Sequence, residues 1–401
     1  MKTAYGCKIL GAHQALRGVR DGVVLFHSVV GCNFGTMALH FSSCDMRDVR
    51  QTCTVISDNE VVFGGGESVK RALASVKELY APKVIFLVTG CVSDIIQDDV
   101  RGPARTFERE TGTRVITVEA AGYRGSADKG FEEALKILAE EMDMPGVQAK
   151  KGERIPVLNI IGPGFDDPRL DADLAALSKL LSGKARLGTV FARCDFEKIC
   201  SAADADLNLV FGPGKELARE MNHRFGTPWE ALPYPYGLTG AEELWSCLER
   251  RFCLDFHEER AAFAGQTSEG AGKIYSYLQA LYGLPAAVIG TSARARGLRS
   301  FLTRELGMEM EVYAEREQVK DLENFYDEVR ASETAVLFGS SFEQELADEL
   351  KIPLFRFDFP VFDRICLTDR PYVGAKGTLC FLEDFLNEAY GARSLKGAMY
   401  Q

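Results

Sequence analysis

Short apolar runs alternate with helical stretches along almost the whole chain, and this alternation limits the possible folds more than any other feature. In the first part of the chain, strands are expected at 23–30, 84–88 and 115–119, and helices at 9–16, 67–80, 98–110 and 130–141. Strands that alternate with helices are typical of βαβ units, in which each helix crosses over between two parallel strands. The first 150 residues therefore predict a parallel sheet with helices packed on it.

The same alternation occurs twice more. The second series has strands at 157–161, 188–191 and 207–211 and helices at 172–181, 215–224 and 241–251. After a helical stretch at 258–281, the third has strands at 287–289, 308–312 and 334–337 and helices at 295–306, 316–330 and 342–350. The predicted fold class is α/β, with three successive doubly wound (Rossmann-like) parallel-sheet domains.

Domain boundaries are expected where the pattern is interrupted. The segment 145–155 is polar and rich in turn-forming residues, which is typical of a linker. We therefore expect domains at 1–150, 151–257 and 258–401. The third includes an aromatic, turn-rich segment at 357–364 that we expect to pack at an interface.

Charge and hydropathy exclude several classes of function. A net charge of −11 argues against nucleic acid or an anionic membrane as the main partner, because either requires a basic surface. The N-terminus does not resemble a signal peptide, and no apolar run approaches the roughly 18 residues of a membrane span, so a cytoplasmic protein is expected. Its 11 cysteines should then be reduced, and divide between buried thiols and metal ligands.

Three cysteines stand beside glycines at positions where a site is expected. Cys91 follows the apolar run 84–88 and Cys32 follows 23–30, whereas Cys7 comes just before a helical stretch. Open α/β sheets place their binding sites at the carboxyl ends of parallel strands. All three thiols can therefore converge at one rim of the first domain.

Thiolates favour iron–sulfur clusters and zinc. The chain contains no Cys-x-x-Cys pair, which excludes a zinc ribbon and a ferredoxin loop. Three thiols on separate strand ends fit a cluster whose other ligands come from a second chain. The alternative is that each cysteine simply packs as a small apolar residue at the end of a buried strand.

Other residues near this rim have open roles. Cys44 and Cys53 lie between the second cysteine and a run of three glycines, and Cys194 and Cys200 form another pair in the second domain. The run at 57–63 is expected to be strand-like, and three glycines follow it at 64–66. This glycine run lacks the Lys-Ser/Thr of a phosphate-binding loop, which favours a tight backbone turn over a phosphate cradle. His27 is expected to make a hydrogen bond that shapes the loop before Cys32.

Four motifs occur in the order found in one known family. They are ALRGVRD at 15–21, LFHSVVGC at 25–32, DNEVVFGG at 58–65 and TGCVSDIIQDD at 89–99. They resemble the AL-G-I-D, L-HGP-GC, E-D-VFGG and TTC-EIIGDD stretches of the nitrogenase component 1 superfamily. FPVFDR at 359–364, followed by GAKG at 374–377, is similar to the β-type subunits of that family.

The resemblance implies a site and a set of partners. Cys7, Cys32 and Cys91 match the three ligands that each subunit gives to the interface iron–sulfur cluster, either a P-cluster-like 8Fe-7S or a 4Fe-4S cluster. Electrons would come from an ATP-hydrolysing iron protein, which itself binds the ATP, and pass through this cluster to an active-site metallocofactor in an α-type partner. The expected assembly is an α2β2 heterotetramer. The resemblance implies no catalytic residue in this chain.

Departures from the family pattern narrow the expected function. Phe211 stands where α-type subunits have a cysteine ligand for the active-site cofactor, and the last histidine is His257, so this chain is not expected to hold that cofactor. Little sequence precedes Cys7, which weighs against dinitrogen reduction. Reductive C–S cleavage, as in methylthio-alkane reductase, is the specific reaction we favour. The alternatives are a cofactor-assembly scaffold and a tetrapyrrole-reductase subunit.

Overall fold

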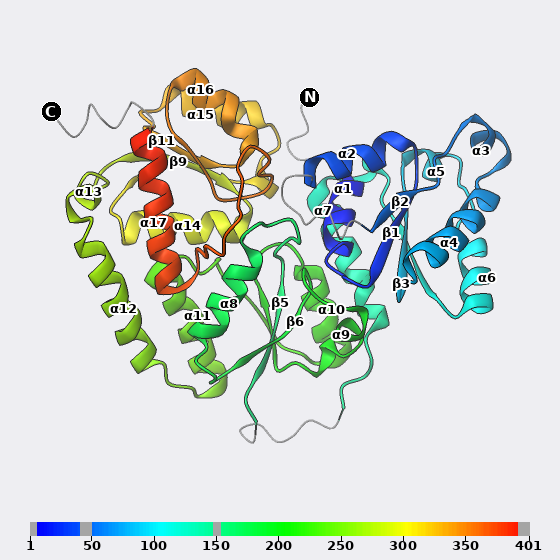
Figure 1. Cartoon of the computed structure of the whole chain (residues 1–401), viewed down its shortest axis with the longest axis horizontal. Coiled ribbons are helices and arrows are strands. Elements are labelled where there is room, and N and C mark those ends of the chain that lie inside the picture. The colour runs from blue at the N-terminus through cyan, green and yellow to red at the C-terminus, as the bar shows by residue number, and fades with distance from the viewer. Residues whose placement is uncertain (1–5, 41–49, 147–153, 392–401) are drawn as a thin grey trace.

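Three parallel sheets of four strands each follow one another in the part of the chain that the structure, a computed structural model, describes: residues 6–40, 50–146 and 154–391 (Figure 1). Their strand orders are β2-β1-β3-β4, β6-β5-β7-β8 and β10-β9-β11-β12. Each sheet thus repeats one arrangement, in which the first strand of the unit lies beside the third. The predicted α/β class with three doubly wound units is confirmed.

The first sheet is covered by helices on both faces. Its strands are β1 (Gly22–His27), β2 (Gln51–Cys53), β3 (Val84–Thr89) and β4 (Arg114–Glu119). Its helices are α1 (Lys8–Leu16), α2 (Val30–His40), α3 (Asp58–Phe63), α4 (Gly66–Tyr80), α5 (Cys91–Ile95), α6 (Arg101–Thr111) and α7 (Ala127–Ile137), with a 3-10 turn, η2, at Gly122–Arg124. Every residue of β1 and β3 is buried, as expected for central strands of a parallel sheet.

The other two units follow the same plan. The second has β5 (Val157–Ile161), α8 (Leu170–Leu180), β6 (Arg186–Val190), α9 (Phe196–Cys200), β7 (Leu207–Val210), α10 (Lys215–Phe225), β8 (Trp229–Ala231) and α11 (Gly237–Phe252). After α12 (His257–Gly272) and α13 (Tyr275–Gln279) come β9 (Pro285–Gly290), α14 (Ser292–Arg304), β10 (Glu309–Glu315), α15 (Leu322–Ala331), β11 (Val336–Gly339), α16 (Gln344–Leu350), β12 (Leu354–Arg356) and α17 (Gly374–Gly391). No helix in the described ranges is long and apolar enough to span a bilayer.

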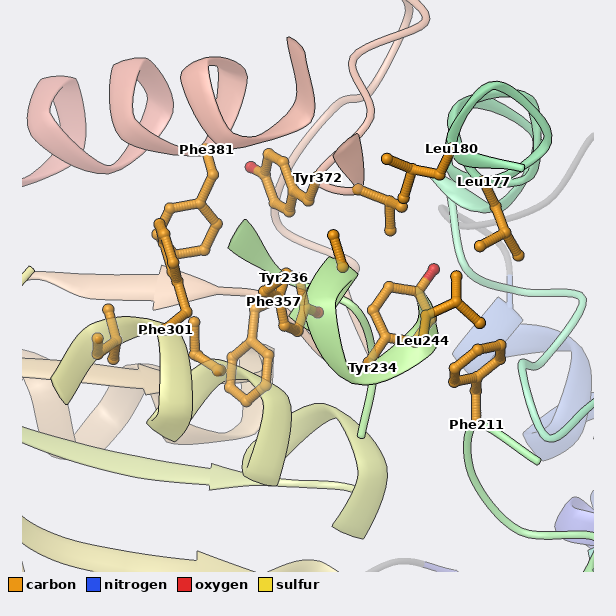
Figure 2. Close-up of a cluster of buried hydrophobic side chains, with 14 of the residues drawn as sticks. Leu177, Leu180, Phe211, Tyr234, Tyr236, Leu244, Phe301, Phe357, Tyr372 and Phe381 are labelled. Atoms are coloured by element: carbon orange, nitrogen blue, oxygen red, sulfur yellow. The ribbon is translucent and has the colours of Figure 1, made fainter. Parts of the chain in front are cut away.

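A continuous apolar core joins the second and third units. Figure 2 shows aromatic side chains from both units packed together, including Phe211 and Tyr234 from one side and Phe301 from the other. Phe381, on α17, stacks edge-on against Phe301 with ring centroids 5.3 Å apart. The last helix, α17, therefore completes an apolar core to which both the second and the third unit contribute side chains.

Several predicted elements differ from the structure. Segment 57–63 was expected to be strand-like but forms α3, because Ser57 and Glu60 make a reciprocal capping box that starts a helix. Cys32 lies inside α2 rather than directly after a strand, since β1 ends at His27. The edge strands β2, β8 and β12 and the helix α17 were missed. Cys44 and the central residues of the predicted linker, 147–153, lie outside the described residues.

Helices α1 and α7 touch backbone to backbone. A Cβ built on Gly11 would lie 1.6 Å from the carbonyl oxygen of Ala127, and one on Gly130 would lie 1.9 Å from the carbonyl oxygen of Lys8. No side chain fits at either position. The two glycines therefore bring the helices together and fix where α1 begins, immediately after Cys7.

We expect Gly11→Ala to lower the free energy of unfolding by about 3 kcal/mol or more, because the added methyl group meets backbone that cannot move aside. Gly265, on α12, is the matched control: a Cβ there has nothing within 4 Å. Gly265→Ala should raise the free energy of unfolding by roughly 0.8 kcal/mol through helix propensity. Urea unfolding of both variants tests this, and equal effects would contradict the packing argument.

Candidate functional site

The carboxyl ends of β1 and β3 form the crevice at which a site is expected in the first sheet. These strands are paired in parallel, and the chain leaves β1 toward β2 on one side and β3 toward β4 on the other. Ligands of open α/β sheets bind at such a reversal of strand order. The segment after β1 carries Cys32, and the residue pair after β3 is Gly90-Cys91.

Cys7 and Cys91 meet at Gly122. Cys7 is the exposed N-cap residue of α1, and Cys91 is the first residue of α5. The backbone N–H of Gly122 donates a hydrogen bond of 3.1 Å to the Cys91 sulfur. A Cβ built on Gly122 would lie 3.1 Å from the Cys7 sulfur and 3.4 Å from the Cys91 sulfur. The structure therefore brings two of the three predicted site residues together.

Cys32 lies near the start of α2, half-buried, with its backbone N–H bonded to the Val29 carbonyl at 3.1 Å. Its neighbour is Cys53, at the end of β2: burial raises the pKa of the Cys53 thiol, and the charge of Cys32 raises it further. The Cys53 thiol donates to the Ser28 carbonyl at 3.3 Å and accepts from the Val55 N–H at 3.3 Å. Cys53 thus lies beside a site residue, while its own hydrogen bonds are internal.

These thiols do not form a site for one metal ion. Across the described residues, no three histidine, cysteine, aspartate or glutamate side chains come close enough to hold a single ion. Cys32 is thus too far from Cys7 and Cys91 for all three sulfurs to bind the same ion. Cys194 is buried in the core, where desolvation raises the pKa of its thiol to about 12, which is typical of a packing cysteine.

Asp94 holds the turn that contacts the two thiols. Its carboxylate accepts a hydrogen bond of 2.8 Å from Arg124 Nε and another from the Tyr123 hydroxyl. Because Asp94 belongs to α5 and both partners belong to η2, the Gly122 N–H stays directed at the Cys91 sulfur. Gly122 was missed in the sequence, although it carries the same signal as the cysteines, a glycine after a strand.

A second buried group ties three loops of the rim together. His27 Nε2 lies 2.8 Å from Asp98 Oδ2, His27 Nδ1 lies 2.9 Å from Thr54 Oγ1, and the Gly65 N–H donates to Asp98 Oδ2 at 2.8 Å. A Cβ built on Gly65 would lie 2.5 Å from that same carboxylate oxygen. The glycine run therefore turns tightly against Asp98, and the Gly65 N–H is already bonded within the protein.

Asp98→Ala should lower the free energy of unfolding by about 2–4 kcal/mol, because two buried N–H groups lose their acceptor. The adjacent Asp99 is the control, since its carboxylate bonds only the exposed Gly102 N–H at 3.0 Å at the start of α6. We expect Asp99→Ala to cost about 1 kcal/mol, the usual loss of a helix cap. Urea unfolding that gave the two variants equal losses would argue against the His27–Asp98 link.

Several large apolar side chains that face solvent lie on α2, α3, α5 and η2, and α2 and α5 also carry Cys32 and Cys91. We call this group the rim patch; its members are Val30, Phe34, Val62, Phe63, Ile95 and Tyr123. Phe63 is 85% exposed and Phe34 is 65% exposed. Figure 1 shows their helices, α2, α3 and α5, along one edge of the first unit. Exposed apolar patches are typical of surfaces that bind another molecule.

A cavity of about 470 Å³ lies where the three units meet. Residues directly after β5, β7 and β9 line it, namely Gly162, Phe211 and Thr291, together with Asp128 from α7. Burial, and then the nearby charge of Glu317, raises the pKa of Asp128 to about 6. The crevices of the second and third sheets therefore open into the interior, whereas that of the first sheet opens at the rim patch.

The fold defines the class of protein. The chain superposes on the solved structure of nitrogenase Cp1 at pH 6.5 with a TM-score of 0.79 and 19% identity, covering 98% of this chain and 93% of the other. The family model of nitrogenase component 1 type oxidoreductases matches residues 7–390, so the chain belongs to this family.

Curated relatives include two kinds of component. The chain is 22% identical to the nitrogenase molybdenum-iron protein beta chain of Methanococcus maripaludis, over 95% of this chain and 92% of the relative. It is 26% identical to the nitrogenase iron-molybdenum cofactor biosynthesis protein NifE of Clostridium pasteurianum, over 82% of this chain and 72% of that protein.

Proposed function

We propose that this chain is the β-type subunit of a nitrogenase-like two-component reductase. In this proposal Cys7, Cys32 and Cys91 hold an iron–sulfur cluster shared with an α-type partner chain. The observation that supports it most directly is the meeting of the Cys7 and Cys91 thiols on Gly122 inside an exposed apolar rim.

The residues present fit such a cluster. Thiolates are the ligands that iron–sulfur clusters take, and a cluster of several irons spaces its ligands more widely than one ion does. The lack of a single-ion site is therefore compatible with a cluster that also takes ligands from the partner. Space is available beside Cys32, because a Cβ built on Gly31 or Gly35 has nothing within 4 Å. When bound, the cluster would supply a store of electrons.

The chain's own residues would prepare this site in two ways. The Gly122 N–H donates a hydrogen bond to the Cys91 sulfur and so holds in place a side chain that would ligate the cluster. The rim patch would be covered by the partner on assembly, excluding water from the thiols. Without water, each hydrogen bond to sulfur has a stronger electrostatic effect.

The active-site metallocofactor would belong to the partner. The central cavity is the place in this chain for such a group, but Phe211, which lines it, stands where α-type subunits have their cysteine ligand. The described lining residues include one cysteine, Cys366, and no histidine. The proposed complex is a cytoplasmic α2β2 heterotetramer, reduced by an ATP-dependent iron protein.

The reaction we propose is reductive cleavage of the C–S bond of methylthio-alkanes. The test is to purify the chain with its α-type partner and count iron and sulfide per pair, which separates an eight-iron from a four-iron cluster. With the iron protein, ATP and dithionite, the complex should release a thiol from methylthio-ethanol. Absence of iron would overturn the proposed function, whereas iron without thiol release would overturn only the substrate.

A cofactor-assembly scaffold is a second candidate, favoured by the similarity to the biosynthesis protein NifE. A scaffold passes its cluster on, whereas a reductase turns over and keeps it. Incubating the iron-loaded complex with an apo-enzyme and measuring iron in each protein separates the two. A four-iron cluster with an acidic ligand from the partner would instead support a tetrapyrrole-reductase subunit.

A further inference from the structure

Ser28 carries a buried hydroxyl without a hydrogen-bond partner. The residue is 1% exposed, and among the described residues nothing lies within bonding geometry of its Oγ. Its carbonyl oxygen, by contrast, accepts from the Cys53 thiol at 3.3 Å and from the Ile56 N–H at 3.0 Å. A buried polar group left unpaired costs about 1–3 kcal/mol, so such a group calls for an explanation.

The hydroxyl lies between the segments that carry two of the site cysteines. Ser28 Oγ is 2.3 Å from the place that a Cβ on Gly90 would take, and Gly90 directly precedes Cys91. The residue after Ser28 is Val29, and its carbonyl oxygen accepts a hydrogen bond from the backbone N–H of Cys32. Gly90 therefore leaves the space in which the hydroxyl sits. In the family motif L-HGP-GC a glycine stands at this position, so the hydroxyl is a departure of this chain.

We propose that Ser28 is a positioning residue whose hydroxyl donates a hydrogen bond to a sulfur of the group held by Cys32 and Cys91. This inference rests on the proposed function. A donor aimed at sulfur stabilises the reduced state more than the oxidised state, because reduction adds negative charge. The reduction potential then rises, as it does when hydrogen bonds to cluster sulfurs are added. Ser28 would make this cluster easier to reduce than one beside the family's glycine.

The test is the reduction potential of the complex carrying Ser28→Ala, measured by a redox titration followed by electron paramagnetic resonance. We expect the reduction potential to fall by about 59 mV, which is a tenfold shift of a one-electron equilibrium toward the oxidised state. Ser28→Gly should shift the reduction potential in the same direction. Both substitutions only remove atoms, so neither introduces a steric clash. Ser300→Ala is the matched control, because Ser300 Oγ is also buried and unpartnered but lies on α14.

A second readout uses the chain without iron. There, Ser28→Ala should unfold in urea no earlier than the wild type, since it removes a hydroxyl that has no partner. A normal iron content with an unchanged potential in both Ser28 variants would overturn the inference alone. An iron-free wild-type complex would overturn the proposed function and this inference with it.

Discussion

Replacing Cys7, Cys32 and Cys91 together with serine should remove the iron from the purified complex. The serine hydroxyl stays protonated near neutral pH and is a much poorer ligand for iron than a thiolate. Cys7 is exposed and the other two are half-buried, so the substitutions leave the core intact. Iron and sulfide content, visible absorption and electron paramagnetic resonance measure the loss.

The control for this variant is Cys253→Ser. Cys253 is exposed and follows α11, in a unit that contributes no cysteine to the proposed cluster. That variant should keep its full iron content, and circular dichroism should show both variants folded. A triple variant that kept its colour and its spectroscopic signature would end the cluster proposal.

Introducing charge into the rim patch should separate the chain from its partner. Phe34→Asp combined with Phe63→Asp places two carboxylates in a surface that would be dehydrated on assembly. Aromatic anchors in interfaces commonly contribute about 2 kcal/mol or more each, so losing two of them costs about 4 kcal/mol and should weaken binding by roughly 700-fold. Co-purification and sedimentation of the pair measure this.

Leu79 provides the matched control for the rim patch. It lies on α4, is 74% exposed and is outside the patch, so Leu79→Asp should not affect assembly. All three side chains are exposed, and the isolated variants should therefore unfold like the wild type. Equal assembly by the rim-patch variant and the control would exclude this surface as the interface.

The central strands could be predicted from sequence, and so could the longer edge strands β4, β6 and β10, but the three shortest edge strands could not. β1 and β3 are buried on both faces, so they consist of uninterrupted apolar runs. β2, β8 and β12 have three residues each and lie at sheet edges, where neither length nor alternation distinguishes them from loops.

The error at α3 has a different physical cause. Val61, Val62 and Phe63 were expected to form a strand because they form an apolar run, yet all three side chains are exposed. Val62 and Phe63 belong to the rim patch, and none of the three lies in a core. An exposed apolar run resembles a buried segment in the sequence, and only the capping pair Ser57 and Glu60 indicated the helix.

The site was only partly predictable for a similar reason. That Cys32 and Cys91 lie at one sheet edge follows from parallel strand pairing, which the sequence pattern indicates. The contact of Cys7 and Cys91 with Gly122 depends on how the turn after β4 folds back. The unpartnered state of Ser28 Oγ depends on all of its neighbours at once, and no local pattern carries that information.

The close contact of α1 with α7 has a consequence for electron transfer. Cys7 caps α1, which Gly11 and Gly130 press against the backbone of α7, and it pairs as an isolated bridge with Ser126 at the start of that same helix. The backbone that carries the Cys7 thiol is therefore held from both sides. If Cys7 ligates the cluster as proposed, this fixed backbone would limit how far the ligand moves when the cluster changes charge, and a small rearrangement favours fast electron transfer.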